Sequence, residues 1–271
     1  MENGLFDITD EDYFADPALN NSYLWRLINK TPAHAQIPIA KTDALTIGTA
    51  THMAILQPNI ATQKIVCGPD TRRGKAWTEA RKEAEENEQI LLTKSDFVTC
   101  MEMRDSIYRN PAAAHLLTQK GTTYEQSAFF EINGNKCKCK VDAAVNDTII
   151  DLKTSADASP AAFVQSVAKF GYHQQNAFYK YGYGQASNKT IAHFIFVVVE
   201  KTPPFACAIY ELDAISEKEG WASANIAIDL HNLCLEQQYF NGYSAEKIML
   251  TLPTWAYVHT NRDAIQLINK G

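Results

Sequence analysis

Apolar and polar positions divide the chain into a helical first part and a strand-rich centre. Candidate helices occupy 20–29, 42–57, 93–110 and 111–119, and each ends at a proline or glycine signal. A further amphipathic helix with alternating basic and acidic residues is expected within 69–90. Residues 1–18 are acidic and irregular, so we expect a solvated or frayed terminus there.

The strand-rich centre begins with a hairpin signal. Asn133-Gly134 is a dipeptide typical of the tightest β-hairpin turns. After it, residues 136–142 alternate strictly between lysine or aspartate and apolar side chains. Because successive side chains of a strand point to opposite faces, the two cysteines and Val141 share one face. Three lysines and Asp142 share the other.

A second strand is predicted at 148–154, where β-branched and apolar residues run up to two charged ones. Asp151 and Lys153 are two positions apart and therefore share a face, while Leu152 points to the core. Pairing of this strand with the previous one would bring Asp142, Asp151 and Lys153 together. The alternative is an exposed strand edge protected by charges, and the spacing Asp-x8-Asp-x-Lys alone does not exclude it.

This predicted cluster carries the chemistry of a metal-dependent hydrolase. Carboxylates and the Leu152 carbonyl are hard oxygen ligands that suit Mg²⁺, and Mn²⁺ is also possible. Lys153 beside the metal could position a water molecule or stabilise charge on a phosphate.

A long helix is expected from Ser159, which is placed to cap it, to about Tyr183. Tyr172, Gln175 and Tyr179 fall on one stripe of this helix. An aromatic stripe usually packs in a core, but a glutamine within it is harder to explain as core.

The rest of the chain completes an α/β pattern. Residues 191–199 form a nearly continuous apolar run, 205–212 alternate, and 216–239 form a long amphipathic helix. This order predicts a central mixed β-sheet flanked by helices, with an N-terminal helical region. We expect one domain over 1–271, divided into a mainly helical part (1–120), a catalytic core (121–240) and a C-terminal extension (241–271).

Several motifs resemble those of one nuclease family, in the family's order. They are Gly48-Thr49-Ala50-Thr51-His52, Glu125-Gln126-Ser127, Cys139-Lys140-Val141-Asp142, Asp151-Leu152-Lys153-Thr154, Tyr172-His173-Gln174-Gln175-Asn176-Ala177-Phe178-Tyr179, the run 194–201 and Leu252-Pro253-Thr254-Trp255-Ala256. The chain thereby resembles the RecE-type, exodeoxyribonuclease VIII-like branch of the PD-(D/E)XK superfamily, whose members are phage and prophage exonucleases. The resemblance implies a restriction-endonuclease-like core.

The resemblance also implies roles for particular residues. It places His52, Glu125, Asp142, Asp151 and Lys153 in the active site, with the Leu152 carbonyl among the metal ligands. Gln175 and Tyr179 are expected to orient the phosphate or the water from the helix behind the sheet. A lone histidine on a helix is otherwise most often a packed or surface residue.

The resemblance further implies an activity and partners. The family digests one strand of duplex DNA from its 5′ end and leaves a 3′ overhang. Its members form rings around DNA and act beside a RecT-like single-strand annealing protein in recombination. Other nucleases on the same core, a non-catalytic DNA- or protein-binding member, and a remote phosphohydrolase acting on nucleotides stay open as alternatives.

The densest basic and aromatic cluster follows residue 70. Arg72, Arg73, Lys75 and Trp77 suit contact with phosphates and stacking on bases, and Tyr172 is a further candidate for contact with DNA. An ordinary loop before a salt-bridged helix explains the first four equally well.

Composition changes this interpretation only modestly. The net charge of −6 counts mildly against nucleic-acid binding, although binding depends on local patches. No apolar run is long enough to span a membrane, and no signal peptide is recognised. Six cysteines without a C-x-x-C pair are expected to be reduced, as in a cytoplasm. No Gly-rich phosphate loop appears, so ATP use is not indicated.

Overall fold

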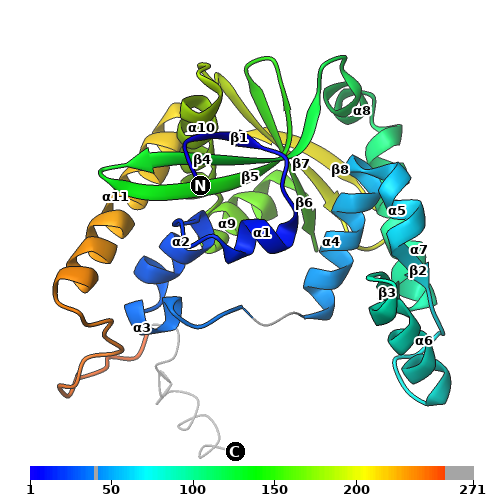
Figure 1. Ribbon diagram of the computed structural model, residues 1–271, viewed down its shortest axis with the longest axis horizontal. Helices are drawn as coiled ribbons and strands as arrows, with labels where there is room; N and C mark the ends of the chain where they lie inside the picture. Colours follow the sequence, from blue (N-terminus) through cyan, green and yellow to red (C-terminus); the bar gives the residue numbers. More distant parts are fainter. Residues whose placement is uncertain (40–41, 254–271) are drawn as a thin grey trace, which may run out of the picture.

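A six-stranded mixed sheet forms the centre of the computed structural model, which describes residues 1–39 and 42–253 (Figure 1). Its strand order is β1-β4-β5-β6-β7-β8, and the neighbours are antiparallel except for the parallel pair β6 and β7. The strands are β1 (Gly4–Phe6), β4 (Thr123–Ile132), β5 (Asn135–Val145), β6 (Thr148–Ser155), β7 (His193–Glu200) and β8 (Cys207–Glu211). The predicted central mixed sheet is confirmed.

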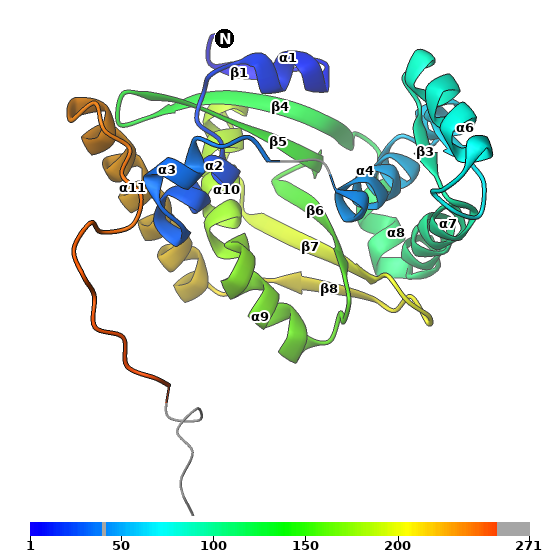
Figure 2. The ribbon, with the colours of Figure 1, turned by 90° about the horizontal axis from the view of Figure 1, so that it is seen from below.

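Helices cover both faces of this sheet (Figures 1 and 2). They are α1 (Asp10–Ala15), α2 (Asn21–Asn29), α3 (Pro32–Ala35), α4 (Asp43–Leu56), α5 (Pro58–Lys64), α6 (Lys75–Glu86), α7 (Lys94–Arg109), α8 (Pro111–Thr118), α9 (Pro160–Phe170), α10 (Tyr172–Ser187) and α11 (Ala214–Glu236). Helices α2, α9, α10 and α11 share one buried cluster with the sheet, and α4, α7 and α8 share another. Two short parallel strands, β2 (Ile65–Cys67) and β3 (Ile90–Leu92), lie beside α4 to α7.

The predicted hairpin joins β4 to β5. Asn133 and Gly134 have φ of 49° and 77°, the left-handed conformations that a type I′ turn requires. Ile132 and Asn135 pair directly across the turn, which sets the register of both strands. The hairpin prediction is therefore confirmed.

The single helix expected from Ser159 to about Tyr183 is wrong in one respect. Ser159 does cap a helix, but that helix ends at Phe170, and α10 begins after Gly171. Gly171 has φ of 70°, and a Cβ atom there would lie 2.4 Å from the Trp25 ring. The chain turns between two helices because only glycine fits this close approach in a left-handed conformation.

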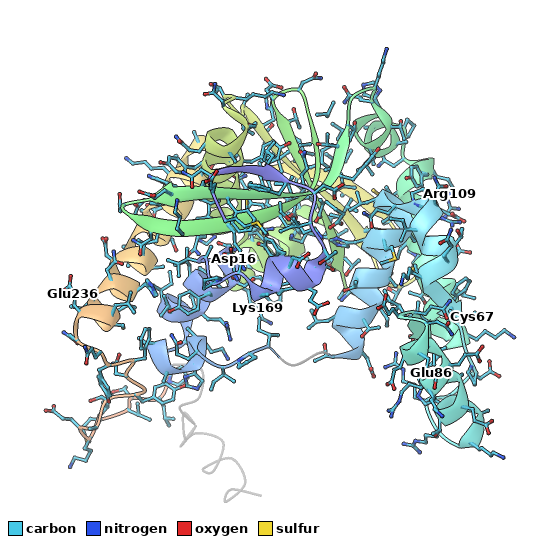
Figure 3. The ribbon with its side chains drawn as sticks, in the orientation of Figure 1. Asp16, Cys67, Glu86, Arg109, Lys169 and Glu236 are labelled. Carbon is cyan, nitrogen blue, oxygen red and sulfur yellow. The ribbon has the colours of Figure 1, made fainter. Side chains whose placement is uncertain are left out.

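The expectation of a frayed N-terminus is also wrong. β1 pairs with β4, and Tyr13 of α1 is buried against Phe129. The ammonium group of Lys138 donates hydrogen bonds of 2.5 Å and 2.6 Å to the carbonyl oxygens of Tyr13 and Asp16. Asp16 lies at the end of α1 (Figure 3). These elements have three and six residues, too short for a periodic pattern to reveal them.

Substitutions of Gly134 and Gly171 distinguish the backbone strain of a positive φ from a steric clash of the added side chain. Both Gly134 and Gly171 have positive φ, but only Gly171 has a side chain in the way of a Cβ atom. We expect Gly134→Ala to destabilise the fold by about 1 kcal/mol, because alanine resists this conformation. Gly171→Ala should cost roughly 1–3 kcal/mol more, because the Trp25 ring must move. Urea unfolding measures both, and equal losses would contradict the packing described at Gly171.

Candidate active site

Three carboxylates stand in one row across adjacent strands. The pair Ala143 and Ile150 places Asp142 of β5 beside Asp151 of β6. The pairs on either side of Glu125 place it opposite Asp142, on β4. The strand pairing that the sequence predicted for Asp142 and Asp151 is present, and the register adds Glu125 to it.

The strands are distorted at this row. Val141 and Ala144 pack in one buried cluster, whereas Ala143 and Val145 pack in the other, so the alternation of β5 slips by one residue near Asp142. Opposite this slip, Glu125 has φ of 53°, a left-handed conformation that costs a non-glycine residue about 1–3 kcal/mol. Such backbone strain concentrates at functional sites. Regular alternation, which the sequence pattern predicts for this strand, therefore breaks at Asp142.

Asp142 and Asp151 are joined to their surroundings by hydrogen bonds. The Leu152 backbone N–H donates to Asp142 at 2.7 Å, and His52 Nδ1 of α4 lies 3.5 Å from the same oxygen. The Gln175 amide of α10 donates to Asp151 at 2.7 Å.

Lys153 completes this network. Its ammonium group donates to the other oxygen of Asp151 and lies 4.7 Å from the centre of the Tyr172 ring. The structure therefore brings together His52 and Gln175 from two helices with the charged residues of β5 and β6.

Burial and mutual charge set the protonation of the pair. Burial raises the pKa of Asp151, whose side chain lies in a residue only 3% exposed. The negative charge of Asp142 raises this pKa further, whereas the positive charge of Lys153 lowers it. Burial acts on Asp142 in the same direction, but the charges of His52 and Lys153 lower its pKa below the usual range. A positive charge between Asp142 and Asp151 therefore stabilises the ionised form of both carboxylates.

Glu125 meets a partner that the sequence analysis did not assign. Its carboxylate lies 3.1 Å from the ammonium group of Lys140 on β5. Burial raises the pKa of Glu125, as does the charge of Asp142, while Lys140 lowers it. Lys140 is two residues before Asp142, and this proximity along one strand is the only signal in the sequence that could have indicated it.

Tyr179 and Tyr172 lie in more apolar surroundings than expected. The Tyr179 ring packs 6.2 Å from that of Phe194, and burial raises the pKa of its hydroxyl well above the usual value. Among the described residues its hydroxyl has no hydrogen-bond partner. Tyr172 lies under Lys153, and so orients that ammonium group.

The basic cluster lies apart from this network. The guanidinium of Arg72 binds the carboxylates of Asp43 and Asp96 and lies 5.9 Å from the Trp77 ring. Lys75 pairs with Glu79, and Arg73 is exposed. The helix α6, which begins at Lys75 and includes Trp77, lies at the outer end of the helical region, away from β6 (Figure 2). Arg72 thus joins α4 to α7, and the contact of this cluster with DNA stays a prediction.

The donor set suits a hard divalent cation. Carboxylates on adjacent strands, with raised pKa values at Asp151 and Glu125, are groups whose crowding a cation would relieve. Within 1–39 and 42–253, no three His, Cys, Asp or Glu side chains are grouped to hold one ion together. Lys140 is paired with Glu125 and Lys153 with Asp151, so each of these carboxylates has an ammonium partner.

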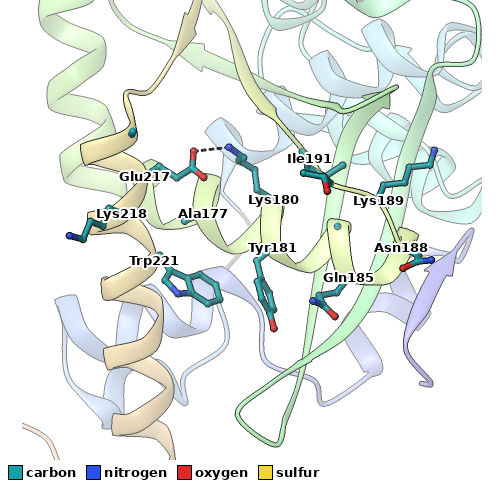
Figure 4. A pocket seen from close by; sticks show the side chains of 13 residues that line it. Ala177, Lys180, Tyr181, Gln185, Asn188, Lys189, Ile191, Glu217, Lys218 and Trp221 are labelled. Atoms are coloured by element: carbon teal, nitrogen blue, oxygen red, sulfur yellow. Dashed lines mark hydrogen bonds and ion pairs between the residues drawn. The ribbon is translucent and has the colours of Figure 1, made fainter.

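A cavity of about 760 Å³ lies elsewhere in the molecule (Figure 4). It is open and lies between α10 and α11, lined by Tyr181 and Trp221 and by lysines that include Lys180. At 100° per residue, Tyr181 points away from the face of α10 that carries Gln175. This cavity therefore takes no part in the carboxylate network.

Comparison with known proteins agrees with this geometry. Residues 26–250 match the family described as "PDDEXK-like domain of unknown function" (DUF3799). The chain belongs to this family. The predicted membership of the PD-(D/E)XK superfamily is thereby confirmed, and members of that superfamily are generally dependent on divalent metal. No curated protein matches the chain.

Solved structures share the fold at low sequence identity. A candidate exonuclease from Eubacterium rectale superposes with a TM-score of 0.64 at 13% identity, over 94% of this chain and 99% of its own. A phage-related exonuclease from Haemophilus somnus (TM-score 0.35, 13% identity) covers 82% of this chain and 97% of its own. An alkaline exonuclease from Laribacter hongkongensis (0.27, 12%) covers 70% and 90%. The first comparison supports the nuclease fold.

No helix within the described ranges is long and apolar enough to cross a bilayer.

The six cysteines are unpaired, and four of them are buried. Of the last family motif, only Leu252 and Pro253 are described, and residues 254–256 lie outside the described residues.

Gln175 offers a test of the network. We expect Gln175→Leu to weaken Mn²⁺ binding about tenfold, because a residue that orients a metal-binding carboxylate is lost. Gln185→Leu, about 15 Å further along α10 and lining the separate cavity, serves as the matched control and should bind as the wild type does. Calorimetric titration measures both, and an unchanged affinity for Gln175→Leu would remove this residue from the site.

Proposed function

We propose that this protein is a Mg²⁺-dependent exonuclease that degrades linear duplex DNA in the 5′→3′ direction and leaves 3′ single-stranded overhangs for recombination. The observation that carries the proposal is the pairing of Asp142 with Asp151 on adjacent strands beside Lys153. The strained Glu125 and the Gln175 hydrogen bond from α10 support it.

Each residue of the site has its own role in in-line hydrolysis of a phosphodiester. Asp142 and Asp151 would hold the cation with the Leu152 carbonyl, and Glu125 and His52 would complete its surroundings. The bound cation supplies Lewis-acid stabilisation of the phosphate and acidifies a water molecule. Lys153 would position the attacking water molecule. As the water oxygen attacks phosphorus and the 3′-oxygen leaves, the ammonium group of Lys153 would stabilise the negative charge that develops. Gln175 holds Asp151 in place through its hydrogen bond, and the Tyr179 ring packs behind the site on the α10 side of the sheet.

The family fold and the resemblance support the remaining parts of the proposal. Arg72, Arg73, Lys75, Trp77 and Tyr172 are the candidate contacts to DNA. A homo-oligomeric ring and a RecT-like annealing partner are what the resemblance implies. The unpaired cysteines support a cytoplasmic location, and the order of elements supports one domain over 1–271. The fold shared with the candidate exonuclease from Eubacterium rectale supports a nuclease.

The catalytic assignment is tested on end-labelled linear duplex DNA with Mg²⁺. We expect Asp151→Asn and Lys153→Met each to lower the rate by roughly 10²–10³-fold, because each removes a charge that acts on the transition state. Lys218→Met, on α11 beside the separate cavity, is the matched control and should keep wild-type activity. Wild-type rates in either site variant would show that these roles are wrong.

Substrate topology and end chemistry distinguish the alternatives. An exonuclease spares closed circular duplex, whereas an endonuclease cuts it. Linear substrates labelled at the 5′ or at the 3′ end give the polarity of digestion. Substrates with 5′-phosphate and with 5′-hydroxyl ends, run in parallel, show which end the enzyme prefers. We expect early release of the 5′ label from linear DNA alone. Cleavage of circles would favour another nuclease on this core, and no Mg²⁺-dependent activity on any substrate would favour a non-catalytic binding protein.

Binding of the cation should also stabilise the fold. At a Mg²⁺ concentration one hundred times its dissociation constant, linkage predicts a gain of about 2.7 kcal/mol in the free energy of unfolding. The double variant Asp142→Asn with Asp151→Asn should lose this gain, since its donors are removed. Thermal unfolding with and without Mg²⁺ measures the difference, and an equal gain in both proteins would place the cation elsewhere.

A further inference from the structure

A chain of three charged groups runs from the N-terminal segment to the active site. The ammonium group of Lys140 lies 2.5 Å from a carboxylate oxygen of Asp10 and 3.1 Å from one of Glu125. The side chains of Lys140 and Glu125 are only 19% and 22% exposed. An ion pair that is largely removed from water is held more firmly than one on the surface.

The N-terminal segment is fixed in place independently of this contact. Lys138, two residues before Lys140 on β5, is 2% exposed and binds the carbonyl oxygens of Tyr13 and Asp16 at the end of α1. Tyr13 packs on Phe129 of β4. Because both ends of α1 contact lysines of one strand, Asp10 at its first turn is held over Lys140.

Glu125 needs such a partner. It stands opposite Asp142 in the strand register, and two neighbouring carboxylates repel each other. Its backbone is also in a left-handed conformation, which must be maintained by its contacts. Lys140 engages one carboxylate oxygen of Glu125, and within the described part of the chain the other oxygen has no hydrogen-bond donor.

We propose that Lys140, held by Asp10 of α1, is a positioning residue that fixes the Glu125 carboxylate beside Asp142 for binding of a divalent cation. This inference rests on the proposed function, because it assumes that Glu125 serves the same cation as Asp142. It adds the N-terminal helix, which contributes no ligand of its own, to the construction of the site.

The test is calorimetric titration of the full-length, metal-free protein with Mn²⁺. Lys140→Met should weaken binding about tenfold, the range seen when outer partners of metal ligands are lost. Lys140→Arg should restore most of the affinity, because it keeps the charge. Asp10→Asn, a change on the surface of α1, should weaken binding in the same direction and less strongly. Lys136→Met, on the same strand but paired with Glu131 at 3.5 Å, is the matched control and should bind as the wild type does.

Coupling to Glu125 separates positioning from general stability. The double variant Glu125→Gln with Lys140→Met should bind Mn²⁺ no more weakly than Glu125→Gln alone, because Lys140 acts only through that carboxylate. Additive losses would overturn the inference, as would wild-type affinity in both Lys140→Met and Asp10→Asn. Wild-type protein that binds no Mn²⁺ would instead overturn the proposed metal-dependent function, and this inference with it.

Discussion

Two buried carboxylates side by side are the constraint on which the rest of the structure depends. Asp142 and Asp151 lie on adjacent strands, where their charges repel and their burial opposes ionisation. Lys153, the Leu152 N–H and the Gln175 amide offset this cost. Each of these partners is fixed by larger elements: β6 by its parallel pairing with β7, and Gln175 by the packing of α10 on the sheet. The fold thus holds together an arrangement that favours a bound cation.

The site extends beyond the strands that carry the two aspartates. Glu125 joins the row from β4, and Lys140 links it to the N-terminal helix. His52 approaches from α4 on the other side. Segments that are far apart in the sequence therefore converge on β5, whose alternation slips where Asp142 enters the row.

Much of this arrangement follows from period and spacing alone. Strand alternation and the Asn133-Gly134 turn predicted the pairing that joins Asp142 to Asp151, and a helical stripe singled out Gln175. What the sequence did not reveal depends on contacts between distant segments. The helix breaks at Gly171 because the Trp25 ring lies against it, and Lys138 is buried because α1 covers it. The sequence left Arg72 equally open to contact with DNA and to salt bridges, and its guanidinium is engaged by two aspartates of distant segments.

Anomalous scattering from crystals grown with Mn²⁺ tests the central claim most directly, because it locates the cation without any assumption about activity. The account predicts one strong peak between the carboxylates of Asp142 and Asp151, within coordination distance of both, with Lys153 displaced from Asp151 or turned toward the open side. A peak found only elsewhere, with Asp142 and Asp151 keeping their hydrogen bonds to Leu152, Lys153 and Gln175, would contradict it.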